Sequence, residues 1–251
     1  MDLGLKGKRA LVTGGTSGIG LAIATCFAEE GADVIVASRT NAKIVTSVKE
    51  IKAQATGGNV SGVVMDLTDE ANVRKAWAGI GHVDILVNNV GGPATGVPLE
   101  IPLEEWDKGY RSLIRSVLMM AQLAVPGMKE CNWGRILTIT STSAREIMPR
   151  LPVSSTFRAG LTALTKELAR ELGRSGILVN NLLPGPTRTE RLAHLETDSP
   201  DFFKSMAEKG AMGRIAEPEE VGRVAAFLCS NANTYITGID MLVDGGYTAA
   251  L

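Results

Sequence analysis

The stretch Thr13-Gly14-Gly15-Thr16-Ser17-Gly18-Ile19-Gly20 indicates how the chain folds. The apolar residues 9–13 before it are typical of a short buried strand, and residues 18–30 after it have the spacing of one apolar helix face. Glycines let the backbone turn tightly and approach a pyrophosphate, and a helix N-terminus offers that anion free N–H groups. A strand, a Gly-rich turn and a helix in this order predict a dinucleotide site, with an ordinary βα turn as the alternative.

The composition is that of an ordinary soluble globular protein. The 251 residues are 45% hydrophobic and 21% charged, and the net charge of −1 offers no electrostatic attraction to nucleic acid or an acidic membrane. Three widely spaced cysteines, Cys26, Cys131 and Cys229, favour neither a disulfide framework nor a metal site. The apolar run after Lys6, Lys8 and Arg9 breaks at Gly14 and Gly15, so we expect no signal peptide, and no apolar stretch has membrane-spanning length. We therefore expect a cytoplasmic protein without metal, nucleic acid or membrane contacts.

Strand and helix patterns alternate along the chain. After the first strand, near-continuous apolar runs typical of parallel strands occur at 33–38, 60–65, 83–87, 134–140, 177–182 and 239–243. Helical patterns lie between them at 41–55, 68–79 (capped by Thr68 or Asp69), 103–129, 154–173, 200–209 and 217–230. This alternation predicts one α/β domain over residues 1–251. The domain is a doubly wound (Rossmann) parallel sheet of about seven strands with helices on both faces.

The end of the second predicted strand points to the cofactor. An acidic residue there commonly binds the ribose 2′-OH of NAD, whereas an arginine suits the 2′-phosphate of NADP. Asp33 opens the strand and so lies at the wrong end. Ser38 and Arg39 close it, and with Thr40 they supply a hydroxyl, a guanidinium and a second hydroxyl. The sequence therefore favours NADP(H), with NAD(H) as the second choice. The alternative for Arg39 is a solvated loop residue.

Two further strand ends carry polar residues. Asp66 follows the third predicted strand, where it faces the adenine edge or serves as a turn or helix-cap aspartate. Asn88 and Gly91 follow the fourth strand. Gly91 permits close approach, and the Asn88 amide can tie neighbouring loops together, with a purely structural turn as the alternative.

These motifs resemble the short-chain dehydrogenase/reductase family, and within it the 3-oxoacyl-acyl-carrier-protein reductases and related small oxidoreductases. The resemblance extends over essentially the whole chain in the family's order and spacing. It is carried by Thr13–Gly20, Asp66-Leu67, Asn88-Asn89-Val90-Gly91, Gly134-Arg135-Ile136, Ser141, Val179-Asn180, Pro184-Gly185 and Asp244-Gly245-Gly246.

The resemblance implies a nicotinamide cofactor, a seven-stranded Rossmann sheet, and a homo-oligomer (a tetramer or dimer) joined through the long helices and the C-terminal region. It also places the substrate lid at about 184–213. The predicted cofactor-binding residues are Thr13, Gly14, Thr16, Ser17, Gly18, Ile19, Ser38, Arg39, Asp66, Leu67, Asn88, Gly91, Pro184, Gly185, Thr187 and Thr189.

The catalytic positions depart from the family. Its members use a Tyr-x-x-x-Lys pair thirteen residues after a serine, and counting from Ser141 reaches Ser154 and Arg158 instead. The family's asparagine, seven residues after a tryptophan, is replaced here by Leu113. Of the expected Asn, Ser, Tyr and Lys, only Ser141 matches.

The substitutions change the proton chemistry. A tyrosine near a cation can supply the proton for carbonyl reduction, whereas serine is far less acidic and arginine stays protonated. Ser141, Ser154 and Arg158 remain the predicted catalytic residues, because they can bond the carbonyl oxygen while water supplies the proton. The structural alternatives are a helix N-cap for Ser154, a strand-end serine at Ser141, and an ion pair or packing role for Arg158.

The remaining polar residues near these positions carry weaker signals. Arg145, Glu146 and Arg150 contact a polar substrate or simply form a solvated loop. His194 lies in the lid, where a lone histidine is more often incidental, and His82 is expected at the surface.

Two functions follow from this pattern. The first is an NADP(H)-dependent oxidoreductase that acts on a small carbonyl or alcohol substrate without the family's tyrosine. The second is a catalytically inactive dinucleotide-binding protein with an assembly or regulatory role. A lyase or isomerase that reuses the cleft is a third, weaker alternative.

Overall fold

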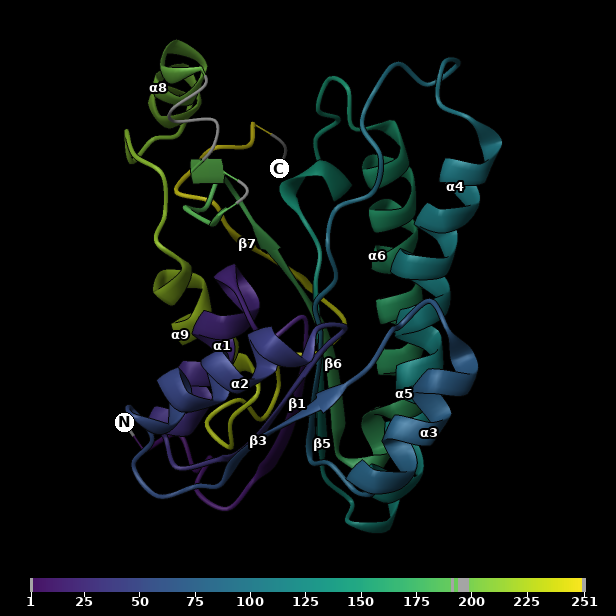
Figure 1. Ribbon diagram of the computed structural model, residues 1–251, viewed down its shortest axis with the longest axis vertical. Helices are drawn as coiled ribbons and strands as arrows, with labels where there is room; N and C mark the ends of the chain where they lie inside the picture. The colour runs from purple at the N-terminus through teal and green to yellow at the C-terminus, as the bar shows by residue number, and fades with distance from the viewer. Residues whose placement is uncertain (1, 191, 194–198, 250–251) are drawn as a thin grey trace.

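The computed structural model describes residues 2–190, 192–193 and 199–249, and its centre is a seven-stranded sheet (Figure 1). All neighbouring strands are parallel, in the order β3-β2-β1-β4-β5-β6-β7. The predicted Rossmann sheet is therefore confirmed, and its strand order reverses between β1 and β4. The strands are β1 Arg9–Thr13, β2 Asp33–Ser38, β3 Val60–Val64, β4 Ile85–Asn88, β5 Gly134–Ile139, β6 Ile177–Pro184 and β7 Asp240–Val243.

Helices cover both faces of the sheet, and α8 lies apart from both layers at one end of the molecule (Figure 1). One face carries α1 (Gly18–Glu29), α2 (Asn41–Lys52) and α9 (Pro218–Leu228). The other face carries α3 (Glu70–Ile80), α4 (Leu103–Tyr110), α5 (Ser116–Glu130) and α6 (Pro152–Leu172). α8 spans Pro200–Lys209.

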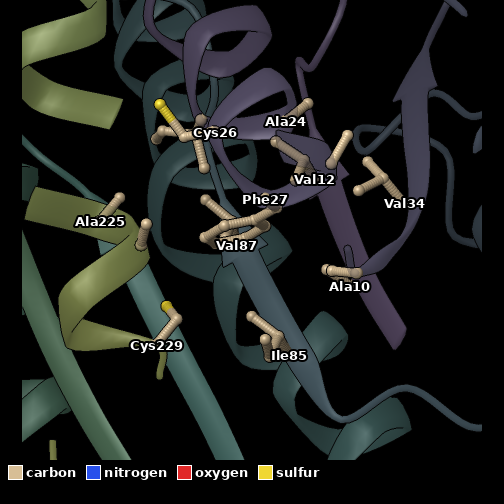
Figure 2. Packing of buried hydrophobic residues seen from close by; sticks show 14 of the residues in the cluster. Ala10, Val12, Ala24, Cys26, Phe27, Val34, Ile85, Val87, Ala225 and Cys229 are labelled. Atoms are coloured by element: carbon tan, nitrogen blue, oxygen red, sulfur yellow. The ribbon is translucent and has the colours of Figure 1, made fainter. Parts of the chain in front are cut away.

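The core consists of two apolar clusters, one on each side of the sheet. Successive residues of a strand point to opposite faces, so Val12 of β1 packs with Phe27 of α1 (Figure 2), and Leu11 packs on the other side with Met120 of α5. Helices α1 and α9 approach closely at Gly222, where a Cβ would lie 2.9 Å from the Cys26 sulfur.

The boundaries differ from the sequence prediction in the two long helices. The helix predicted at 103–129 is interrupted by a π-helical turn over Arg111–Arg115, which separates α4 from α5. Helix α6 begins at Pro152 rather than 154, because proline is well accommodated in a first helical turn. Ser154 is therefore inside the helix and is not its N-cap. Asp69 caps α3 as predicted, since its side chain accepts a hydrogen bond from the Asn72 N–H.

A buried arginine joins the start of β5 to two other segments. Arg135 is 5% exposed, and its guanidinium donates hydrogen bonds to the backbone carbonyls of Gly134, Gly176, Ser230 and Asn233 at 2.8–3.3 Å. Burial lowers the pKa of Arg135 from its usual range. The carbonyl dipoles take the place of a carboxylate partner and tie β5 to the loops that precede β6 and β7.

Helix α9 begins with a reciprocal capping box between Glu217 and Glu220. In this box, the Glu220 carboxylate accepts a hydrogen bond from the Glu217 backbone N–H at 2.9 Å. It also accepts hydrogen bonds from both terminal nitrogens of Arg214, at 2.7 and 2.8 Å. These bonds lower the pKa of Glu220 to about 2.

Candidate active site

A cavity of about 650 Å³ opens at the carboxyl ends of β1, β2 and β4. This is where ligands bind in doubly wound sheets. Predicted site residues that line it are Thr13, Gly14, Thr16, Ser17, Gly18, Ile19, Ser38, Arg39, Asp66, Leu67, Gly91, Arg158 and Thr189. Thr40, Asn89 and Val90, which belong to motifs that the sequence analysis used, also line the cavity. Sequence reasoning missed Ala37, Lys43, Met65, Thr68, Gly92, Ser112, Ile139, Thr140 and Glu190.

The Gly-rich turn forms one wall of this cavity. Gly14 and Gly18 have φ of +57° and +52°, which disfavour any residue with a side chain. Ser17 is the N-cap of α1; within the described chain its side chain makes no cap hydrogen bond, and the first turn of α1 has no acidic residue. The N–H groups of that turn are thus available to an anion, and the cradle fits the pyrophosphate of a dinucleotide.

Asn89, rather than Asn88, ties the loop after β4 to the Gly-rich turn. The Asn89 amide donates to the Gly14 carbonyl at 3.1 Å, and its backbone N–H donates to the Thr13 hydroxyl at 2.9 Å. The predicted tie through Asn88 is wrong. Asn88 is 2% exposed, does not line the cavity, and its amide nitrogen has no hydrogen-bond partner among the described residues.

The end of the cavity beside β2 and β3 is polar. Asp66 accepts hydrogen bonds from the backbone N–H and the hydroxyl of Thr68, which lower the pKa of its carboxyl, and the Arg39 charge lowers it further. Asp66 is thus both a turn residue and part of the cavity wall. Lys43, in the first turn of α2, adds a second cation and lies 4.0 Å from the Glu190 carboxylate.

The predicted catalytic residues gather where β5 meets the start of α6. Arg158 is 6% exposed, and its guanidinium donates to the Ile139 carbonyl at 3.0 Å and to the Ser154 hydroxyl at 3.2 Å. Ser141 caps a short 3-10 turn by accepting the Ser143 N–H at 3.1 Å. Arg158 lines the cavity, whereas neither Ser141 nor Ser154 belongs to the described lining.

Two glycines bring α6 against the other long helix. A Cβ on Gly109 would lie 2.4 Å from a Val153 methyl, and one on Gly160 would lie 3.4 Å from Ile114. Leu113, at the position of the family's asparagine, is completely buried in the π turn. Its neighbour Ser112 lines the cavity together with Arg158. The close packing of the two helices thus brings the Ser112 hydroxyl to the cavity, although no local sequence signal indicates it.

The segment after β6 lies against the Gly-rich turn. Thr189 lines the cavity, and its methyl carbon would lie 3.0 Å from a Cβ on Gly18. The other predicted residues of this segment, Pro184, Gly185 and Thr187, are not among the described lining residues. Thr187 instead bonds the Gly185 carbonyl at 3.0 Å and pairs with Ala216.

The loop before α6 makes internal ion pairs. Arg145 lies 3.1 Å from the buried Asp240 carboxylate of β7, and Glu146 lies 2.9 Å from Lys209 of α8. The Arg150 carbonyl accepts the Gly96 N–H at 2.9 Å. These contacts join the loop to neighbouring segments, so it is more than a solvated loop.

His82 is exposed, as expected from the sequence, and its Nε2 lies 3.3 Å from the Asp84 carboxylate. His194 lies outside the described residues.

Comparison with known proteins identifies the family. A family model described as enoyl-(acyl carrier protein) reductase matches residues 14–248. The chain is 35% identical to the 3-oxoacyl-acyl-carrier-protein reductase of Aquifex aeolicus, covering 98% of this chain and 99% of that protein. It is 33% identical to the 7alpha-hydroxysteroid dehydrogenase of Escherichia coli K12, covering 98% and 96%. The chain therefore belongs to the short-chain dehydrogenase/reductase family of oxidoreductases.

The fold is also similar to that of solved structures. L-sorbose reductase from Gluconobacter frateurii, in complex with NADPH and L-sorbose, superposes with a TM-score of 0.94 at 32% identity, covering all of both chains. Within the described part of the chain, no helix has the length and apolar character needed to cross a membrane.

Proposed function

We propose that the protein is an NADP(H)-dependent oxidoreductase that reduces a small carbonyl compound or oxidises the corresponding alcohol. One observation carries this proposal: a single cavity is lined by Arg39 at one end and by Arg158 at the other. A guanidinium suits a 2′-phosphate at the first position and a carbonyl oxygen at the second. The similarity to an L-sorbose reductase that binds NADPH supports the same cofactor.

The chain's own residues would hold the cofactor and the substrate oxygen. When bound, the nicotinamide supplies or accepts the hydride. The first turn of α1 binds the pyrophosphate, and Arg39 binds the 2′-phosphate. Arg158 donates hydrogen bonds and puts a fixed positive charge near the oxygen that becomes negative, but it cannot release a proton. Ser141 and Ser154 contribute hydroxyl donors, and water supplies the proton.

The missing tyrosine lowers the expected rate without abolishing it. General acid–base catalysis by a positioned group contributes roughly 10²–10⁴-fold, and the alignment of hydride donor and acceptor contributes separately. A reactive carbonyl therefore remains a reasonable substrate. The second candidate, an inactive dinucleotide-binding protein, is supported by the buried Leu113 and by the absence of Ser141 and Ser154 from the described cavity lining.

The test measures NADPH consumption with a panel of ketones, aldehydes and keto acids, and NADP⁺ reduction with polyols. We expect turnover by the wild type, and a loss of roughly 10²-fold in kcat for Arg158→Ala, the usual effect of removing an oxyanion donor. Thr156→Ala is the control, because Thr156 is exposed on the same helix. NADPH binding with no turnover on any substrate would establish the second candidate. Full turnover by both Arg158→Ala and Ser141→Ala would refute the site assignment.

A further inference from the structure

A serine outside the predicted site is bonded directly to one inside it. Ser143 lies in the 3-10 turn after β5, is 2% exposed, and has its hydroxyl oxygen 3.2 Å from that of Ser154. Ser141 holds the turn by accepting the Ser143 N–H at 3.1 Å. Residues eleven positions apart thus meet in a buried contact between the loop and α6.

The hydrogen-bonding capacity of Ser154 determines what this contact does. A serine hydroxyl has one proton to donate and two lone pairs that accept. Arg158 Nε is always a donor, and it occupies one lone pair of the Ser154 oxygen at 3.2 Å. Either serine can donate in the Ser143–Ser154 bond. If Ser154 donates, its proton is bonded to the Ser143 oxygen. If Ser143 donates, both lone pairs of the Ser154 oxygen are filled, and the Ser154 proton is available to bond another acceptor.

We propose that Ser143 is a positioning residue that donates its hydrogen bond to Ser154. Both lone pairs of the Ser154 oxygen are then filled, so this hydroxyl can only donate to a further partner. Its proton is directed to the oxygen of the carbonyl substrate. Ser154 is not itself among the described lining residues, but it is 7% exposed and is bonded to Arg158, one helical turn away, which lines the cavity. The neighbouring positive charge polarises the Ser154 O–H bond and favours its donation to an oxygen that gains negative charge. This inference rests on the proposed function.

The adjacent serine provides a matched control. Ser155 is 9% exposed, lies in the same turn of α6, and its hydroxyl has no hydrogen-bond partner within the described residues. Ser155→Ala removes the same type of atom, a buried hydroxyl oxygen, from the same turn of α6 and leaves Ser154 in place. A general effect of deleting a buried hydroxyl near the start of α6 would therefore lower kcat in this variant as well.

The experiment compares Ser143→Ala, Ser154→Ala, the double variant and Ser155→Ala. We expect Ser143→Ala to lose about tenfold in kcat, the usual worth of one hydrogen bond, with KM and NADPH affinity unchanged. In the Ser154→Ala background, Ser143→Ala should cause no further loss. In the protein that retains Ser154, Ser143→Thr keeps the hydroxyl and should have most of the wild-type kcat that Ser143→Ala loses. Wild-type kcat in Ser143→Ala, or losses that multiply in the double variant, would overturn the proposal.

A second measurement needs neither cofactor nor turnover. The free energies of unfolding in urea of the wild type, the two single variants and the double variant form a double-mutant cycle. We expect the two substitutions to be non-additive, because they remove the same hydrogen bond; additive values would overturn the inference. An inactive wild type, by contrast, would refute the proposed function, so the two failures are distinguishable.

Discussion

Replacing Arg39 tests how the protein selects its cofactor. Arg39→Ala removes a guanidinium from the cavity wall beside Ser38 and Thr40. The substitution also removes a positive charge that lowers the pKa of the Asp66 carboxyl, so the negative charge of Asp66 is less well balanced near the incoming phosphate. NADPH carries the 2′-phosphate and NADH does not. We therefore expect the variant to bind NADPH more weakly and NADH almost as before.

The size of the effect follows from the exposure of the site. A hydrogen bond that involves a charged group contributes about 1.5–3 kcal/mol, and the exposed position of Arg39 favours the lower end. At about 1.4 kcal/mol per factor of ten, NADPH affinity should fall roughly 10- to 30-fold. Lys43 also lines the cavity, so the preference for NADPH should be reduced rather than reversed.

Fluorescence titration with NADPH and NADH gives both dissociation constants for the wild type and the variant. The control is Arg170→Ala, because Arg170 is exposed on α6, where it pairs with Glu167 away from the cavity. An Arg39→Ala protein with the wild-type ratio of the two constants would refute the assignment of Arg39 to the 2′-phosphate. An equal loss for both cofactors, which leaves that ratio unchanged, is one form of this result and indicates general damage to the cavity.

Two further predictions concern stability. Arg135→Met leaves several backbone carbonyls without their hydrogen-bond donor, and removing the cost of burying the guanidinium offsets only part of this loss. The free energy of unfolding, measured in urea, should therefore fall by about 2–4 kcal/mol. A change below about 0.5 kcal/mol would contradict the role given to Arg135. Glu220 has a folded pKa of about 2, below its ordinary value of 4.5, so its carboxylate stabilises the folded state above pH 4.5 and this contribution disappears as the pH falls toward 2. Glu220→Gln should therefore be less stable than the wild type at pH 7 and equal to it near pH 2, as measured by urea midpoints across that range; a constant difference would contradict this.

The parallel sheet and the succession of its strands along the chain were predictable because each strand has a local signal. Apolar runs and Gly-rich turns mark the strand ends, and parallel strands need a helix between them. The π turn at Arg111–Arg115 was not predictable. It adds one residue to a helix whose next turns are apolar on several sides, as at Leu118, Met119 and Met120, so the shift in phase leaves no clear trace in the pattern.

The candidate site was predictable where it follows strand ends and not where side chains meet across elements. Residues of the Gly-rich turn and the end of β2 line the cavity because local motifs place them there. Asn88 and Asn89 are adjacent polar residues, and only the backbone direction after β4 determines which one faces the turn. Ser143 and Ser112 are common residue types in a loop and a helix, and only tertiary packing gives them a polar neighbour or access to the cavity.

The close packing within the Gly-rich turn shows that this motif is needed for the fold itself, apart from any role in cofactor binding. A Cβ on Gly20 would lie 2.2 Å from the Gly14 carbonyl oxygen and 2.5 Å from the Asn89 amide, so the chain cannot accept a side chain there even in the absence of a ligand. A short-chain dehydrogenase/reductase that had lost catalysis, or even cofactor binding, would still need that glycine in order to fold. The motif therefore indicates the fold of a protein, whereas the activity of that protein has to be tested at residues such as Ser154 and Arg158.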